Sequence, residues 1–190
     1  MPVKNLRHLP KAHLHLHLEG AMRPATLTEF CARYKIERPS DTRGQQFSNF
    51  TAFNEVYRAA SDSIRTKQDL ARVVLEVAED AAKDGANWIE LAFDADRYTI
   101  LRADRSFRLF ETPYEGWLFA LEAARNASEK TGVGISFISA IDRTRPIEQA
   151  NERAKLTTNL ISSQKHQITA KNINGGEPYA GIIGLGLHGN

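Results

Sequence analysis

The sequence predicts an α/β protein in which the strands of a parallel sheet alternate with helices. Three observations support this fold class. Short apolar segments recur along the chain, amphipathic segments separate them, and capping residues or glycines mark where the helices begin and end. The chain has 190 residues, the length of one domain, so residues 1–190 are expected to belong to a single domain. Hydrophobic residues make up 42% and charged residues 25%, as in an ordinary folded protein.

The first predicted strand covers residues 12–18. A helix is expected to begin at Pro24, because proline is favoured in the first turn, and to end near Tyr34. Residues 35–65 carry aromatic and apolar side chains at helical spacing among polar ones, so we expect additional helical material there.

The clearest helix is expected over residues 67–84, where apolar side chains recur every three or four positions. Thr66 and Asp69 resemble a capping box at its start, and Gly85 suits a left-handed residue at its end. The next strand is expected over residues 88–93. Helix, glycine and strand together form one helix-to-strand unit.

The same order repeats further along the chain. Thr112 and Pro113 are typical of a helix start, and Gly132 is expected to end that helix. The residues that follow, 133–138, are short and largely apolar, so we expect the third strand there.

A weaker helix is expected over residues 146–160, a loop over 161–181, and the fourth strand over 182–187. A (β/α)8 barrel, the TIM barrel, needs eight strands and typically ~250 residues. The pattern therefore predicts about the first half of such a barrel, with four strands and their helices.

Charge and composition exclude several classes of function. The chain has 25 Lys and Arg residues against 23 Asp and Glu residues, and a net charge of +2 is too small to indicate a nucleic-acid or anionic-membrane partner. No apolar run approaches the ~20 residues that span a bilayer, so we expect a cytoplasmic protein. The single cysteine, Cys31, excludes a cysteine-built zinc cluster, so any metal must use histidines and carboxylates.

Three histidines, His13, His15 and His17, alternate with leucines in the first predicted strand. Side chains at alternate strand positions share a face, so we expect the three imidazoles to form one row facing the barrel axis. Neutral imidazoles on a rigid strand can converge on zinc or a related ion. The alternative is an exposed strand with one polar face.

Other motifs have weaker functional interpretations. Residues 184–189 match the Gly-x-Gly-x-x-Gly pattern of dinucleotide-binding turns, but no helix follows that could face a pyrophosphate. Asp94 and Asp96 could act as catalytic carboxylates, although a solvated cluster with Arg97 is the preferred interpretation. For Glu90 we favour a hydrogen-bonding role in the barrel interior over direct catalysis.

The segment from Leu9 to Ala21, LPKAHLHLHLEGA, resembles the first-strand signature of the adenosine deaminase family within the metal-dependent amidohydrolases. The resemblance continues through the helix after Pro24, the strand around Glu90 and the terminal Gly-Leu-His-Gly-Asn. It implies that residues 1–190 form a partial metal-dependent hydrolase domain, which corresponds to the amino-terminal half of such an enzyme.

The resemblance also implies roles for individual residues. His15 and His17 correspond to two zinc ligands, Glu19 to an acidic residue that helps hold the nucleoside sugar, and Gly189 to a glycine whose backbone amide binds the purine ring. Two positions depart from the commonest pattern. His13 replaces a residue that is often acidic, and Glu19 replaces a frequent Asp, which leaves the sugar or base substituent open.

The implied reaction is hydrolytic deamination, in which zinc activates water and adenosine is converted to inosine and ammonia. The family's third histidine ligand, its aspartate ligand, its general acid and its water-orienting histidine fall beyond the end of this chain, so no catalytic residue is assigned here. A purine nucleoside is the expected partner, and exposed barrel edges could cause self-association. The alternatives are a deaminase of adenine or of a modified nucleoside, and a truncated, non-catalytic product.

Overall fold

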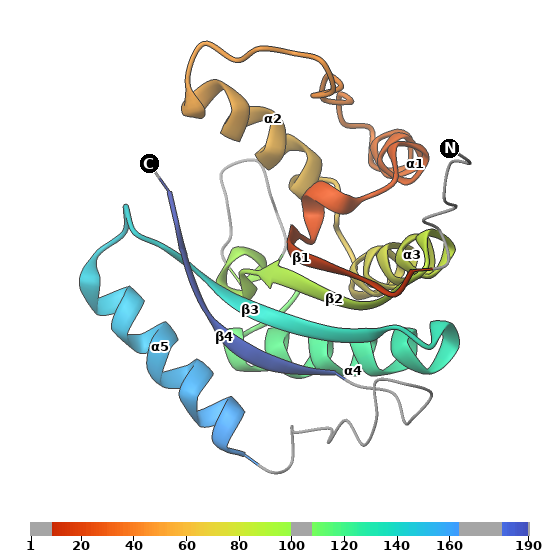
Figure 1. Ribbon diagram of the computed structural model, residues 1–190. Coiled ribbons are helices and arrows are strands. Elements are labelled where there is room, and N and C mark those ends of the chain that lie inside the picture. The colour runs from red at the N-terminus through yellow and green to blue at the C-terminus, as the bar shows by residue number, and fades with distance from the viewer. Residues whose placement is uncertain (1–8, 100–107, 164–179, 190) are drawn as a thin grey trace, which may run out of the picture.

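The computed structural model describes residues 9–99, 108–163 and 180–189 and confirms the α/β fold class. The described strands form one parallel sheet of four, in which each strand pairs with the next in the order β1-β2-β3-β4 (Figure 1). Strands alternating with helices in this order make up the first half of a (β/α)8 barrel. The strand bounds are β1 Lys11–His17, β2 Ala86–Phe93, β3 Gly134–Asp142 and β4 Ala180–His188.

The helices follow the predicted order, with small differences at their ends. Residues 35–65 contain a complete helix, as their apolar spacing predicts, and the predicted loop 161–181 lies mostly outside the described residues. The α-helices are α1 Pro24–Tyr34, α2 Phe50–Asp62, α3 Lys67–Asp84, α4 Pro113–Thr131 and α5 Ile147–Ser162, and two 3-10 turns are η2 Glu19–Ala21 and η3 Ala95–Tyr98.

The capping residues that the sequence indicated are present. The Thr66 hydroxyl accepts a hydrogen bond from the Asp69 amide, and the Asp69 carboxylate accepts one from the Thr66 amide, which completes a capping box at the start of α3. Gly85 and Gly132 end α3 and α4 with φ angles of 83° and 73°, a region that glycine enters without steric cost. Local sequence therefore sets both ends of α3 and the end of α4.

The hydrophobic core lies between the sheet and the two helices α3 and α4. Phe93, Trp117 and Phe137 meet there with ring centroids 5.1 to 5.8 Å apart, and each is at most 1% exposed. Burying each such ring contributes roughly 1.5–3 kcal/mol. The same layer contains Leu70, Val73, Val74, Val77, Ile89, Leu91, Ala120, Ala124 and Ile135.

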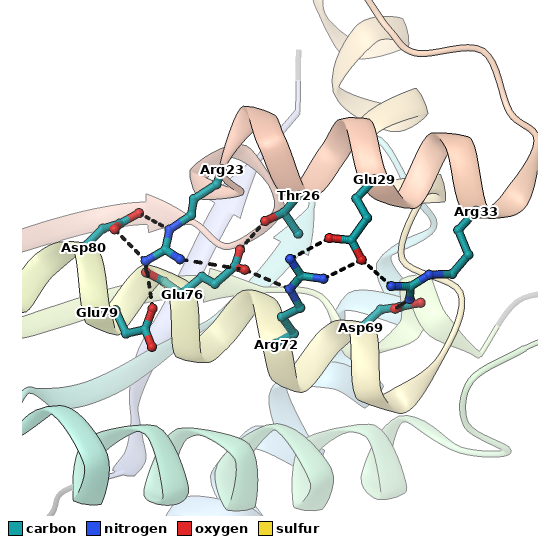
Figure 2. Close-up of polar contacts among 9 residues, drawn as sticks. All are labelled: Arg23, Thr26, Glu29, Arg33, Asp69, Arg72, Glu76, Glu79 and Asp80. Carbon is teal, nitrogen blue, oxygen red and sulfur yellow. Dashed lines mark hydrogen bonds and ion pairs between the residues drawn. The ribbon is translucent and has the colours of Figure 1, made fainter.

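Helix α1 is joined to α3 by a row of ionic contacts, which we call the α1–α3 ladder (Figure 2). At one end Arg23 donates to Asp80 at 2.7 and 2.8 Å, and at the other end Arg33 donates to Asp69 at 2.9 Å. The intervening members are Thr26, Glu29, Arg72, Glu76 and Glu79. The ladder aligns α1 along α3, beside the strand that carries the histidine row.

Strand β1 departs from regular alternation, and the prediction that three imidazoles share one face is wrong. Its pairing with β2 shifts register between His13 and Leu16, and His15 has a φ of 62°. This bulge inserts an extra residue and changes which face the following side chains occupy. His13 therefore contacts Asp84 at the end of α3, with 3.3 Å between Nε2 and Oδ2, and does not join His15 and His17.

Strand β4 carries exposed apolar side chains. Ile183, Leu185 and Leu187 are 45%, 47% and 67% exposed, although they lie in a sheet whose central strands β2 and β3 are largely buried. Parallel strands are normally covered on both faces, so this strand lacks part of its cover among the described residues. None of the helices in the described ranges is long and apolar enough to cross a bilayer.

Candidate metal centre

His15 and His17 lie side by side at the carboxyl end of β1, where active sites of parallel barrels are built. Their ring centroids are 5.4 Å apart and the rings are tilted by 56°. An ion held at ~2 Å from one nitrogen of each of two imidazoles, at the tetrahedral angle, separates the ring centroids by roughly 5 Å. The pair therefore has the spacing that one bound ion requires.

The surroundings of His17 favour its neutral form. Burial lowers the pKa of His17, the nearby His15 lowers it further, and the Glu19 carboxylate opposes both effects. Neutral imidazole is the form that binds a metal ion, so His17 needs little deprotonation near neutral pH. The Tyr57 ring meets the His17 ring edge-on at 6.0 Å and forms one wall of the site.

Glu19 is buried in a hydrogen-bonded cluster, which we call the Glu19 cluster, formed by Glu19, Tyr57 and Tyr98. Tyr57 of α2 donates to Oε2 and Tyr98 of η3 donates to Oε1, both at 2.7 Å, and Glu19 is 4% exposed. Burial together with the Glu19 charge raises the pKa of both phenols, so they remain protonated donors. The residue expected to bind a sugar thus has both oxygens bonded to protein.

Sequence reasoning missed both tyrosines of the Glu19 cluster. Tyr57 lies 38 residues and Tyr98 lies 79 residues from Glu19, so no local spacing connects them. One signal was available, because Glu19 lies two residues after His17 at the family's acidic position. A buried carboxylate there requires hydrogen-bond donors from elsewhere in the chain.

The acidic pair after β2 is held by α5, and the interpretation of a solvated cluster with Arg97 is wrong. Arg153, 6% exposed, bonds Asp96 and lies 3.5 Å from Asp94. Burial raises the pKa of Asp94 while the Arg153 charge opposes the shift. Arg97 instead stacks over the Tyr57 ring at 5.6 Å and donates to Ser61, so it supports α2.

Glu90 accepts a hydrogen bond from the Trp88 indole at 3.2 Å, in agreement with the predicted hydrogen-bonding role. The dinucleotide interpretation of residues 184–189 has no structural support, because Gly184 and Gly186 lie inside β4 and form no turn. Gly186 instead allows β3 to approach, since an added Cβ would lie 2.9 Å from Ile138.

Gly189 directly follows β4, at the same edge of the sheet as the histidine pair. Its φ is 100°, and an added Cβ would lie 2.8 Å from the Asp142 carboxylate, so the position requires glycine for both reasons. The Asp142 carboxylate is held in turn by Thr144, whose amide donates at 2.9 Å and whose hydroxyl donates at 2.6 Å. The Gly189 backbone is thus placed at the rim of the candidate site.

The structure adds His188, which the sequence did not assign to the site. Its ring centroid lies 5.4 Å from that of His17, with 41° between the rings. In a flat sheet three strand spacings would separate β1 from β4 by roughly 14 Å. The contact therefore shows that the sheet curls and brings the side chains of its first and last strands together. Among the described residues, no three His, Cys, Asp or Glu side chains already converge on one point.

Comparison with known proteins identifies the class of protein that this fold and site define. The adenosine deaminase family model matches residues 10–182, and the chain belongs to that family.

One relative is a Streptomyces virginiae protein with the provisional name adenosine/adenine deaminase. It is 31% identical over 161 residues, which cover 80% of this chain and 45% of that protein. The adenosine deaminase of Clostridium acetobutylicum is 26% identical over 178 residues, covering 89% of this chain and 50% of its own.

The solved structure of an adenine deaminase from Arthrobacter aurescens superposes with a TM-score of 0.63 at 26% identity, covering 95% of this chain and 49% of its own. The chain thus spans about half the length of the relatives that it matches. These relatives differ in the purine compound that their names give.

Proposed function

We propose that this chain is the amino-terminal part of a zinc-dependent aminohydrolase that removes the exocyclic amino group of a purine as ammonia. The observation that carries the proposal is the His15 and His17 pair, spaced for one ion at the carboxyl edge of a half-barrel of the adenosine deaminase family. A bound zinc or similar divalent ion would supply an activated water near neutral pH for attack on the amino-bearing carbon.

The described residues contribute binding and orientation to this reaction. His15 and His17 would hold the ion, and the amide of Gly189, at the rim of the candidate site, would donate to a ring nitrogen of the purine. The Glu19 cluster and Arg97 anchor Tyr57 beside His17, which limits how the His17 ring can turn. Such supporting contacts orient metal ligands in other proteins.

The packing of Glu19 bears on the choice between adenosine and adenine. The resemblance implies that this acid holds the sugar of adenosine, but both of its oxygens already accept phenolic hydrogen bonds in a buried setting. A ribose hydroxyl would have to enter this cluster or displace a tyrosine. We therefore propose the free base adenine as the preferred substrate, with adenosine or a modified nucleoside as the second candidate.

The test uses the full-length, metal-loaded protein with adenine and adenosine, followed by ammonia release and the ultraviolet change of the purine. We expect deamination of at least one of them and a higher kcat/KM for adenine. Tyr57→Phe frees one Glu19 oxygen, so it should raise the adenosine-to-adenine ratio severalfold. Tyr34→Phe, which removes a phenol bonded to Asp69 away from the site, is the matched control. The absence of deamination with adenine, with adenosine and with an amino-modified adenosine contradicts the proposed function.

A further inference from the structure

We propose that His188 joins His15 and His17 in binding a divalent cation to this chain. The inference rests on the proposed function only in that both place a cation at His15 and His17. It adds a third imidazole, from the opposite end of the sheet order, that no sequence motif assigned.

The distances from His17 to the other two rings carry the inference. His188 lies as far from His17 as His15 does, with both centroid separations at 5.4 Å. One ion bound by two imidazoles at the tetrahedral angle gives roughly 5 Å, so either pair fits a shared ion. The three rings do not yet converge on one point, so His188 must rotate about its side-chain bonds to complete the group.

The backbone of His188 is held in place, so only that side-chain rotation is required. Its carbonyl accepts a hydrogen bond from the Arg143 amide at 2.8 Å, and the residue pairs with Asp142 in the sheet. A third ligand anchored on a strand can therefore approach the pair without a change of fold.

The carboxylates at this edge are less available than His188. Both oxygens of Glu19 are bonded by tyrosines, Asp94 and Asp96 contact Arg153, and Asp142 accepts two hydrogen bonds from Thr144. Freeing any of them would leave a hydroxyl or a guanidinium without its partner. Among the described contacts of His188, the carbonyl accepts hydrogen bonds from Arg143, and no hydrogen bond to the imidazole competes with metal binding. Histidine also suits zinc and cobalt better than carboxylate does.

The experiment measures metal binding by the 190-residue chain and needs no activity. The chelator-treated protein is titrated with Co²⁺, followed by its visible absorption, and with Zn²⁺ against a competing indicator. Wild type is compared with His188→Ala and His17→Ala. His13→Ala is the matched control, because it removes an imidazole from the same strand that is bonded to Asp84. Far-UV circular dichroism verifies that each variant is folded.

We expect one equivalent of metal in the wild type and in His13→Ala. His188→Ala should weaken binding by more than about tenfold, the loss that even a supporting residue of a metal site commonly causes. Equal affinity of His188→Ala and wild type overturns the inference, and so does the absence of binding to a folded wild-type chain. In either case a full-length protein that still deaminates purines leaves the proposed function standing.

Discussion

The two ends of the sheet differ in how completely the described residues cover them. On the β1 side, α1 packs along α3 through the ionic ladder, and the acidic residues Asp69 and Glu76 are only 2% and 7% exposed (Figure 2). On the β4 side, Leu185 and Leu187 are about half or more exposed. Buried ionic contacts therefore fix the helix layer beside β1, whereas apolar side chains of β4 remain exposed among the described residues. We call the α1–α3 layer the covered side and β4 the open side.

The β1 side therefore bears mainly on the stability of the chain, and the β4 side bears mainly on its activity and association. The β1 side has its own core, caps and ion pairs, so its geometry is set within the chain. The β4 side carries His188 and Gly189 at the rim of the candidate site, and its apolar side chains remain exposed among the described residues.

The largest expected effect concerns activity. The 190-residue chain alone should show little or no purine deamination. A version extended to full family length should deaminate purines several orders of magnitude faster. Several groups that act together in the transition state would be missing, and such groups fail non-additively. Ammonia release by both metal-loaded proteins measures the difference. Robust deamination by the 190-residue chain would contradict the view that this chain holds only part of the catalytic site.

On the covered side, Asp69→Ala should lower the free energy of unfolding by roughly 2–4 kcal/mol, because it removes a buried carboxylate that accepts several hydrogen bonds and completes a helix cap. The donors are Arg33, Tyr34 and the amides of Arg65 and Thr66. Urea unfolding provides the measurement.

The matched control for Asp69→Ala is Glu129→Ala, which breaks an exposed ion pair with Arg125 on α4 and should cost less than about 0.5 kcal/mol. Similar losses for the two variants would show that the ladder is no more important than an exposed pair.

On the open side, the wild-type chain should self-associate, because apolar patches and free sheet edges promote association. The double change Leu185→Ser and Leu187→Ser should reduce the average mass in light scattering. Leu14→Ser, at a residue of β1 that is 62% exposed, serves as the control and should reduce it less. A monodisperse wild-type monomer would show that the exposed side chains of β4 do not cause self-association.

The smallest effect is a pH dependence of the ladder. The hydrogen bond from Arg23 lowers the pKa of Asp80, so Asp80 stabilises the fold above its unfolded pKa of ~3.9 and this contribution is lost as pH falls through the lower folded value. Asp80→Asn should therefore cost up to about 1 kcal/mol at pH 6 and progressively less as the pH falls below the unfolded pKa of Asp80. A cost that does not change with pH would assign the effect to packing instead.

The sequence predicted the fold well because its signals are local. The capping box at Thr66, the glycines that end α3 and α4, and the apolar periods all act within a few residues, and the structure confirms them. The sequence predicted that the histidines lie on the first strand, but it did not predict that His13 lies apart from His15 and His17. The bulge at His15, which separates them, depends on how β1 pairs with β2.

The partners of Glu19 and the approach of His188 could not be predicted, because both depend on distant segments. The first requires α2 and η3 to meet the end of β1, and the second requires the sheet to curl. Neither leaves a spacing pattern in one sequence.

The central claim is that His15 and His17 hold the metal of a purine aminohydrolase, and metal content measured together with ammonia release tests it most directly. The full-length protein is compared with the double variant His15→Ala and His17→Ala, and with His13→Ala. We expect about one equivalent of zinc and deamination in the wild type and in His13→Ala, and loss of both in the double variant. Full zinc occupancy in a folded double variant, or deamination without these imidazoles, would contradict the account.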